Sequence, residues 1–266
     1  PHGVILSQTI HEGKDGQGDE IVMECRGIDL TTCLTLEAHG LIERVVTRPI
    51  LLDGIFQNSF ISEKPLGVTT DSTGMVFRVF APRARKMTLK LFSDPDLHHP
   101  IRSVPLTRDV DGVWEARVSE PLWGVYYLYQ IEGPHGEGEG FRTDRLWADP
   151  YARATIYHNG PALILNPGDL SKHGFSNWSD QDFRTPDKRD LVIWECSVRD
   201  LSSHASSHVD AKHRGKYLGL IDTVGKGSGI DHALHLGINA VELLPVHEFD
   251  DDPPGAYHWG YMSSFY

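Results

Sequence analysis

The 266-residue sequence has little of what marks disulfide-stapled, membrane-spanning or nucleic-acid-binding proteins. Its three cysteines, Cys25, Cys33 and Cys196, form no CxxC spacing, which argues against a zinc site or a disulfide framework. No apolar run approaches membrane-spanning length, so we expect no membrane partner. Lys and Arg number 25 against 37 Asp and Glu. The resulting net charge of −12 argues against nucleic acid as a partner and suits a neutral ligand.

The location of the protein in the cell is left open by the sequence. Scattered thiols favour a reducing, cytoplasmic compartment. No signal peptide is visible, but the chain begins at Pro1 rather than Met, so this absence is uninformative.

Fifteen histidines are present without the pattern of a metal site. The pairs His98–His99, His204–His208 and His232–His235 have spacings that ligands can use, but neither an HExxH motif nor companion carboxylates accompany them. We interpret the Asp250–Asp252 run as a solvated loop rather than a calcium site. We therefore expect no metal and no cofactor.

The first 166 residues carry the patterns of β-structure. Residues 1–62 contain short aliphatic runs that predict a small sheet, namely Val4–Leu6, Ile21–Cys25, Leu34–Leu36 and Val45–Leu52. Within residues 63–166, apolar and polar side chains alternate in the period of antiparallel strands over Gly74–Phe80, Lys86–Phe92, Gly112–Val118 and Gly124–Ile131. Turn signals between these runs predict an immunoglobulin-like β-sandwich of roughly 100 residues.

The periodicity changes after a turn-rich linker at residues 167–190. Leu191–Val198 and Ala240–Val246 are compact apolar runs that predict strands buried on both faces. Gly229–Gly237 has helical spacing and ends on a glycine. Strand, helix and strand in this order predict a parallel pair joined by a crossover within residues 191–266.

Several motifs in this last region resemble one enzyme family. Trp194–Leu201, followed by Arg214–Leu220, is similar to the first strand and loop of pullulanase-type debranching enzymes in glycoside hydrolase family 13, the α-amylase family. Leu236–Val246 resembles the exit of that family's first helix and its second strand, and Tyr257–Tyr261 resembles the next segment. One departure is Ser197, where pullulanases usually have His.

Upstream motifs resemble the β-sandwich that precedes such a barrel, carbohydrate-binding module family 48. They are Phe77–Pro82, Gly124–Tyr127 and Asp149–Ala152. The resemblance runs from about Val45 to the last residue, and it rests on the collinear order of the motifs. It implies an all-β N-terminal part followed by the first two strands of an incomplete (β/α)8 TIM barrel, whose C-terminal remainder would be a partner.

The resemblance implies hydrolysis of α-1,6 branch linkages in pullulan, glycogen or starch, with an α-glucan polysaccharide as the partner. In that family the catalytic carboxylates follow the fourth and fifth strands, so no residue here is assigned as catalytic and the fragment is expected to be inactive. Glu195 and Glu242 lie within predicted strands and are not stand-ins. Two alternatives remain open: a non-catalytic α-glucan-binding module, and another family member such as a branching enzyme or isoamylase.

The candidate substrate-binding residues are aromatic or lie beside aromatic residues. By resemblance, Tyr261 stacks on the sugar ring at the cleaved bond, and His258 and Trp259 are candidates to line the same cleft. Trp123 lies in a Pro-Leu-Trp-Gly turn of the sandwich and is a candidate for sugar contact. Trp114 shares a strand face with other apolar residues, so we assign it to the core.

Arg199 and Asp200 follow the first predicted barrel strand. They could face the cleft, but we favour pairing with neighbouring residues that stabilises the first loop, because buried charges require partners.

Overall fold

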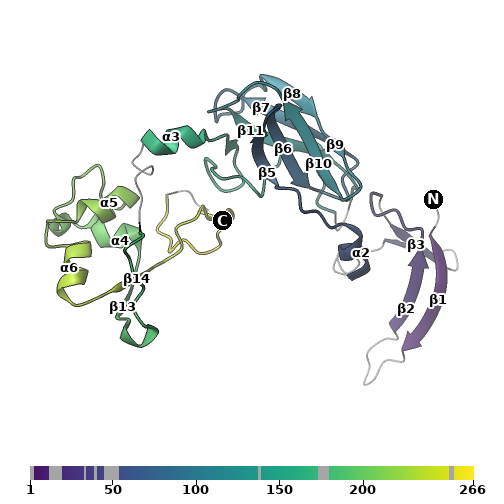
Figure 1. The fold of residues 1–266 in the computed structure, drawn as a ribbon. Coiled ribbons are helices and arrows are strands. Elements are labelled where there is room, and N and C mark those ends of the chain that lie inside the picture. Colours follow the sequence, from purple (N-terminus) through teal and green to yellow (C-terminus); the bar gives the residue numbers. More distant parts are fainter. Residues whose placement is uncertain are drawn as a thin grey trace. The chain divides into compact units, whose positions relative to one another are not determined.

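The computed structural model describes residues 3–11, 20–32, 34–38, 41–44, 54–136, 139–172, 180–251 and 255–266 (Figure 1). The chain divides into two compact units, Pro1–Tyr151 and Ala152–Tyr266, and each is considered by itself. Cys33, the strand expected at Val45–Leu52, the linker turn at Ser176–Ser179 and Asp252 lie outside the described residues. The expected domain limits at 62, 166 and 190 stay predictions.

The N-terminal segment forms two separate antiparallel ladders. One joins β1 (Val4–His11) to β2 (Glu20–Arg26), and the other joins β3 (Thr35–Ala38) to β4 (Leu41–Arg44). The short helix α2 (Gly54–Ser59) follows. The predicted small sheet is therefore two hairpins, and apolar side chains on β1 and β2 such as Val4 and Val22 remain exposed.

Two antiparallel sheets form the body of the first unit. The first has the order β5 (Gly67–Asp71), β6 (Gly74–Phe80), β10 (Val113–Val118), β9 (Thr107–Arg108). The second contains β11 (Tyr126–Glu132), β7 (Lys86–Phe92) and β8 (Arg102–Pro105). The predicted β-sandwich is confirmed. The sequence did not reveal β5, β8 and β9, which are short; β8 and β9 are also largely exposed, so no alternating pattern marks them.

The core of the sandwich lies between these two sheets. Phe77 on β6 meets Tyr127 on β11 edge to face, with ring centroids 5.5 Å apart. Burial of apolar side chains from both sheets supplies the main driving force for this packing. Trp114 is buried, as its pattern predicts, and its indole Nε1 donates to the carbonyl oxygen of Ala81 at 2.9 Å. That bond satisfies the one polar atom that the Trp114 side chain brings into the core.

The second unit contains a parallel pair of strands joined by helices. It begins with β12 (Ala162–Leu163) and α3 (Pro167–Lys172). The elements that follow are β13 (Ile193–Cys196), α4 (Val198–Ser203), α5 (Tyr217–Asp222), α6 (Gly229–His235) and β14 (Ala240–Leu243). β13 and β14 pair in parallel, as predicted, and their register places Ile193 opposite Ala240. Helix α6 ends just before Gly237, whose φ of 78° terminates it as expected.

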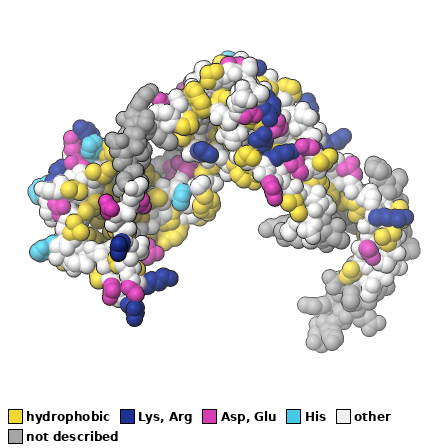
Figure 2. All heavy atoms as spheres, in the orientation of Figure 1, with side chains coloured by type: hydrophobic (Ala, Val, Ile, Leu, Met, Phe, Trp, Pro, Cys, Tyr) yellow, Lys and Arg dark blue, Asp and Glu magenta, His cyan; other side chains and the backbone are white. Residues whose placement is uncertain are grey.

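The expectation that both of these strands are buried on both faces is wrong. Ile193 is 56% exposed and Val241 is 49% exposed. Among the described residues no third strand pairs with β13 or β14, and a two-stranded sheet cannot cover both of its own faces. Hydrophobic side chains accordingly appear on the surface of this unit (Figure 2). The eight-stranded barrel stays a proposal.

Two searches of the described ranges gave negative results. None of the helices in them combines the length and apolarity needed to cross a bilayer. No group of three or more His, Cys, Asp or Glu side chains in the same ranges could hold a metal ion.

Candidate functional site

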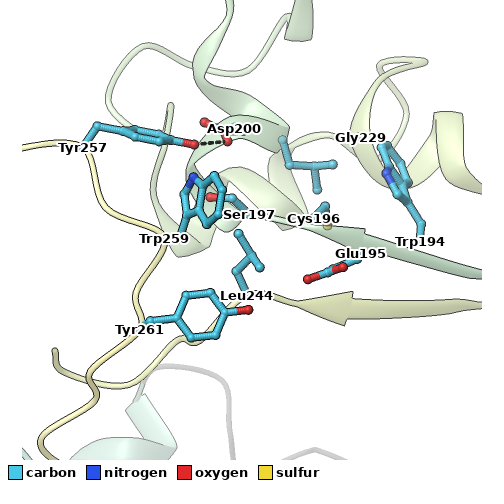
Figure 3. Close-up of a pocket in the computed structure, with 11 residues that line it drawn as sticks. Trp194, Glu195, Cys196, Ser197, Asp200, Gly229, Leu244, Tyr257, Trp259 and Tyr261 are labelled. Atoms are coloured by element: carbon cyan, nitrogen blue, oxygen red, sulfur yellow. Dashed lines mark hydrogen bonds between the residues drawn. The ribbon is translucent and has the colours of Figure 1, made fainter.

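A hollow of about 700 Å³ lies at the carboxyl ends of β13 and β14 (Figure 3). Both strands are parallel, so their carboxyl ends open on the same edge of the sheet. The lining combines strand ends, the start of α4 and an aromatic segment; its residues are Trp194, Glu195, Cys196, Ser197, Asp200, Leu201, Gly229, Leu244, Tyr257, Trp259 and Tyr261.

The aromatic wall of this hollow comes from one short segment in which every second side chain faces the cavity. Tyr257, Trp259 and Tyr261 line it, and each is more than half exposed. His258 is not among the lining residues: its ring lies against Phe249, with centroids 5.7 Å apart. Its Nε2 is buried and has no hydrogen-bond partner among the described residues. Of the three predicted residues in this segment, the structure brings Trp259 and Tyr261 together and turns His258 away.

Gly260 allows the aromatic segment to pass close to the end of β14. Its φ is 84°, a conformation that favours glycine. A Cβ atom at this position would lie 2.4 Å from the carbonyl oxygen of Pro245. Any other residue would push the chain away from Pro245 and displace the aromatic side chains on either side of Gly260.

Tyr257 is a wall residue that the sequence did not single out. Its hydroxyl donates to Oδ2 of Asp200 at 2.6 Å, across 57 residues of chain. The Arg199 guanidinium lies 5.2 Å from the centroid of the same ring. Arg199 and Asp200 thus find their shared partner in the aromatic segment, and Asp200 also lines the hollow. The sequence did carry one signal for Tyr257. It lies two residues before Trp259, so in an extended segment both side chains point to the same side.

The floor of the hollow is formed where β13 passes into α4. Burial raises the pKa of the Cys196 thiol. Next to it, the Ser197 side chain accepts a hydrogen bond from the backbone N–H of Arg199 at 3.2 Å and so caps the helix. The residue that departs from the pullulanase pattern therefore has a local structural role, which fixes the start of the helix that carries Asp200.

The remaining candidate, Trp123, belongs to the first unit. It lies in the turn between β10 and β11 and is 36% exposed. The indole is therefore partly accessible to solvent, and Trp123 is not among the residues that line the hollow.

Comparisons with known proteins point to one group of enzymes. The family described as Carbohydrate-binding module 48 (Isoamylase N-terminal domain) matches residues 65–152, which include strands β5 to β11. Isoamylase 3, chloroplastic, of Oryza sativa subsp. japonica is 34% identical over 207 residues, covering 70% of this chain and 25% of that protein. The pullulanase of Bacillus subtilis (strain 168) is 31% identical over 223 residues, covering 80% of this chain and 28% of that protein.

This chain is similar to isoamylases and pullulanases over most of its length, and its residues 65–152 match a carbohydrate-binding module. A solved structure agrees: the pullulanase from Paenibacillus barengoltzii, in complex with maltohexaose and α-cyclodextrin, matches with a TM-score of 0.67 and 29% identity. The match covers 79% of this chain and 33% of that one. The chain spans about a quarter of the length of the two curated relatives.

Proposed function

We propose that this chain is part of a glycoside hydrolase that cleaves α-1,6 branch linkages in pullulan, glycogen or starch. In this proposal, residues 191–266 supply the first two strand–helix units of a (β/α)8 barrel, and the hollow is part of its sugar cleft. The observation that carries the proposal is the aromatic wall at the carboxyl ends of two parallel strands. Barrel enzymes bind their substrates at this end of their strands.

The chemistry of the hollow suits a neutral sugar. Aromatic ring faces pack against apolar surface, and one face of a glucose ring is made of C–H groups. Trp259 and Tyr261 present such rings to the cavity, while Asp200 and Ser197 contribute polar atoms at its edge. The Paenibacillus barengoltzii pullulanase was solved with maltohexaose, which supports an α-glucan as the ligand of the related cleft.

The two carboxylates of the hollow do not supply the catalytic pair in this proposal. A retaining glycosidase needs a nucleophile and an acid/base about 5 Å apart. Asp200 is held by the Tyr257 hydroxyl and Glu195 lies within β13. The acids would come from further strands of the barrel. We therefore expect no release of reducing sugar when the 266-residue chain is incubated with pullulan. Turnover that copurifies with the chain through successive columns would contradict this.

Replacing Trp259 with Ala should weaken binding of maltotetraose to the chain by about tenfold, because the variant loses an aromatic stacking surface. Isothermal titration calorimetry measures the dissociation constant, and the thermal midpoint should not change, since the Trp259 side chain is 61% exposed. Equal affinities of the wild type and Trp259→Ala for maltotetraose would contradict the proposal that the hollow is the sugar site.

A second candidate function is glucan binding by the sandwich alone, without a role in cleavage. The match of residues 65–152 to a carbohydrate-binding module and the partial exposure of Trp123 favour it. The Trp123→Ala variant separates the two sites in the same titration. Loss of affinity in Trp123→Ala, with unchanged affinity in Trp259→Ala, would support the sandwich as the binding surface.

A further inference from the structure

The wall residue Tyr257 is held in the hollow by two side chains of different chemistry. Its hydroxyl donates to Asp200, and the Arg199 guanidinium lies over its ring. The hydrogen bond to Asp200 is the main cause that raises the pKa of Tyr257. The hydroxyl therefore remains protonated near neutral pH and keeps the proton that it donates to Asp200.

Helix α4 fixes the position of the Asp200 carboxylate, because the aspartate side chain is short and keeps the carboxylate close to the helix backbone. Asp200 lies in the first turn of α4, which is capped by Ser197. Helix α4 is also held from its other side, because Ser202 accepts from the backbone N–H of Gly215 at 3.0 Å. Asp200 itself is exposed and takes no part in these two bonds. Removing its carboxylate should thus leave α4 in place.

We propose that Asp200 is a positioning residue that holds the Tyr257 ring, part of the aromatic wall, ready for a glucose ring. The inference rests on the proposed function of the hollow and assigns the order of contacts within it. An aromatic ring fixed before the sugar arrives loses less rotamer freedom on binding than a free one. The bond between Tyr257 and Asp200 joins the start of α4 to the aromatic segment, beside the contact of Arg199 with the same ring.

Four variants of the 266-residue chain test this order of contacts with maltotetraose as the probe. Asp200→Ala and Tyr257→Phe should each weaken binding by about fivefold, because each breaks the same hydrogen bond. The double variant should be no weaker than either single one, since the two residues act in series. Asp200→Asn keeps an oxygen that accepts from the tyrosine and should bind nearly as well as the wild type.

A matched control removes a carboxylate of the same unit that lies outside the hollow. Glu242 on β14 is exposed and does not line the cavity, so Glu242→Ala should bind maltotetraose like the wild type. Thermal midpoints of all variants should agree with that of the wild type, which separates positioning from loss of fold.

Three results would overturn the inference. One is unchanged affinity in Asp200→Ala and Tyr257→Phe while Trp259→Ala loses affinity, which leaves the proposed function standing. Another is additive loss in the double variant, which would mean that Asp200 and Tyr257 contact the sugar independently. The last is equal weakness of Asp200→Asn and Asp200→Ala, which would make the negative charge rather than the hydrogen bond decisive. Unchanged affinity in Trp259→Ala would instead contradict the proposed function of the hollow.

Discussion

Replacing Arg83 with Ala is expected to lower the free energy of unfolding of the sandwich by about 3–5 kcal/mol, the cost of breaking a buried ion pair. The Arg83 guanidinium donates from both terminal nitrogens to the two carboxylate oxygens of Glu139, each at 2.8 Å. The two side chains are only 10% and 3% exposed. The variant leaves the Glu139 carboxylate buried without its guanidinium.

Arg83 also links the sandwich to the N-terminal segment. Its Nε donates to the carbonyl oxygen of Leu30 at 2.9 Å, and its guanidinium lies 5.8 Å from the centroid of the Phe141 ring. Arg83→Ala also loses these contacts, which adds to the expected fall in the free energy of unfolding. Urea unfolding followed by NMR amide signals of β6 and β7 measures the stability of this unit separately from the second one.

A matched control is the exposed pair between Lys86 and Glu132, 2.8 Å apart on neighbouring strands of the second sheet. Because both side chains are solvated, Lys86→Ala should cost less than about 1 kcal/mol. The double variant Arg83→Met with Glu139→Leu should recover much of the stability lost in Arg83→Ala, since no charge stays buried. A small loss in Arg83→Ala, comparable to that in Lys86→Ala, would refute the buried-pair explanation.

Replacing Asp149 with Asn is expected to stabilise the same unit by about 3 kcal/mol at about pH 7.5 and by about half as much at about pH 5. Asp149 is fully buried, and desolvation raises its pKa to about 6 against an ordinary value of 3.8. The Tyr127 hydroxyl, at 2.8 Å, and the backbone N–H of Tyr151, at 2.9 Å, donate to it and offset only part of that cost.

The sign follows from the raised pKa of Asp149. Because the folded state binds the proton more tightly than the unfolded state, the contribution of Asp149 to stability is complete below pH 3.8 and is lost as the pH rises through about 6. Urea unfolding at several pH values from 3.8 to about 8 measures this loss of stability. Most carboxylates with lowered pKa, such as Asp111 at about 2, titrate below this window.

Asp144 provides the control for the Asp149 prediction. It is exposed, and its hydrogen bonds with Arg142 lower its pKa, so Asp144→Asn should not stabilise the protein at any pH in this window. A stability difference between the wild type and Asp149→Asn that stays constant from pH 5 to pH 7.5 would show that the carboxyl does not titrate as its burial requires.

The position of Asp149 illustrates what a sequence pattern does not contain. The backbone groups of Tyr129 and Trp147 exchange two hydrogen bonds, of 2.8 and 2.7 Å, in antiparallel register. Tyr127 lies two residues before Tyr129 and Asp149 two residues after Trp147, so the Tyr127 hydroxyl meets the Asp149 carboxyl. The sequence marked Asp149 only as part of a family motif, because its burial depends on a pairing across the fold.

In the candidate site, too, the sequence predicted some features and only the structure revealed others. The aromatic segment was found from the sequence because its residue types and order are local. The alternation that brings Trp259 and Tyr261 to the hollow and turns His258 toward Phe249 required the structure. Tyr257 was missed, since its importance lies in a bond to Asp200, 57 residues earlier.

By itself, the sequence determined the antiparallel sandwich, the parallel strand pair and the similarity to isoamylases and pullulanases, because side-chain periodicity and short motifs are properties of neighbouring residues. Only the tertiary structure decided that β13 and β14 are exposed, that Arg83 and Asp149 are buried, and that Asp200 holds Tyr257. Exposure and pairing depend on which distant segments meet, and the free energy of a charge depends on how much water that meeting removes.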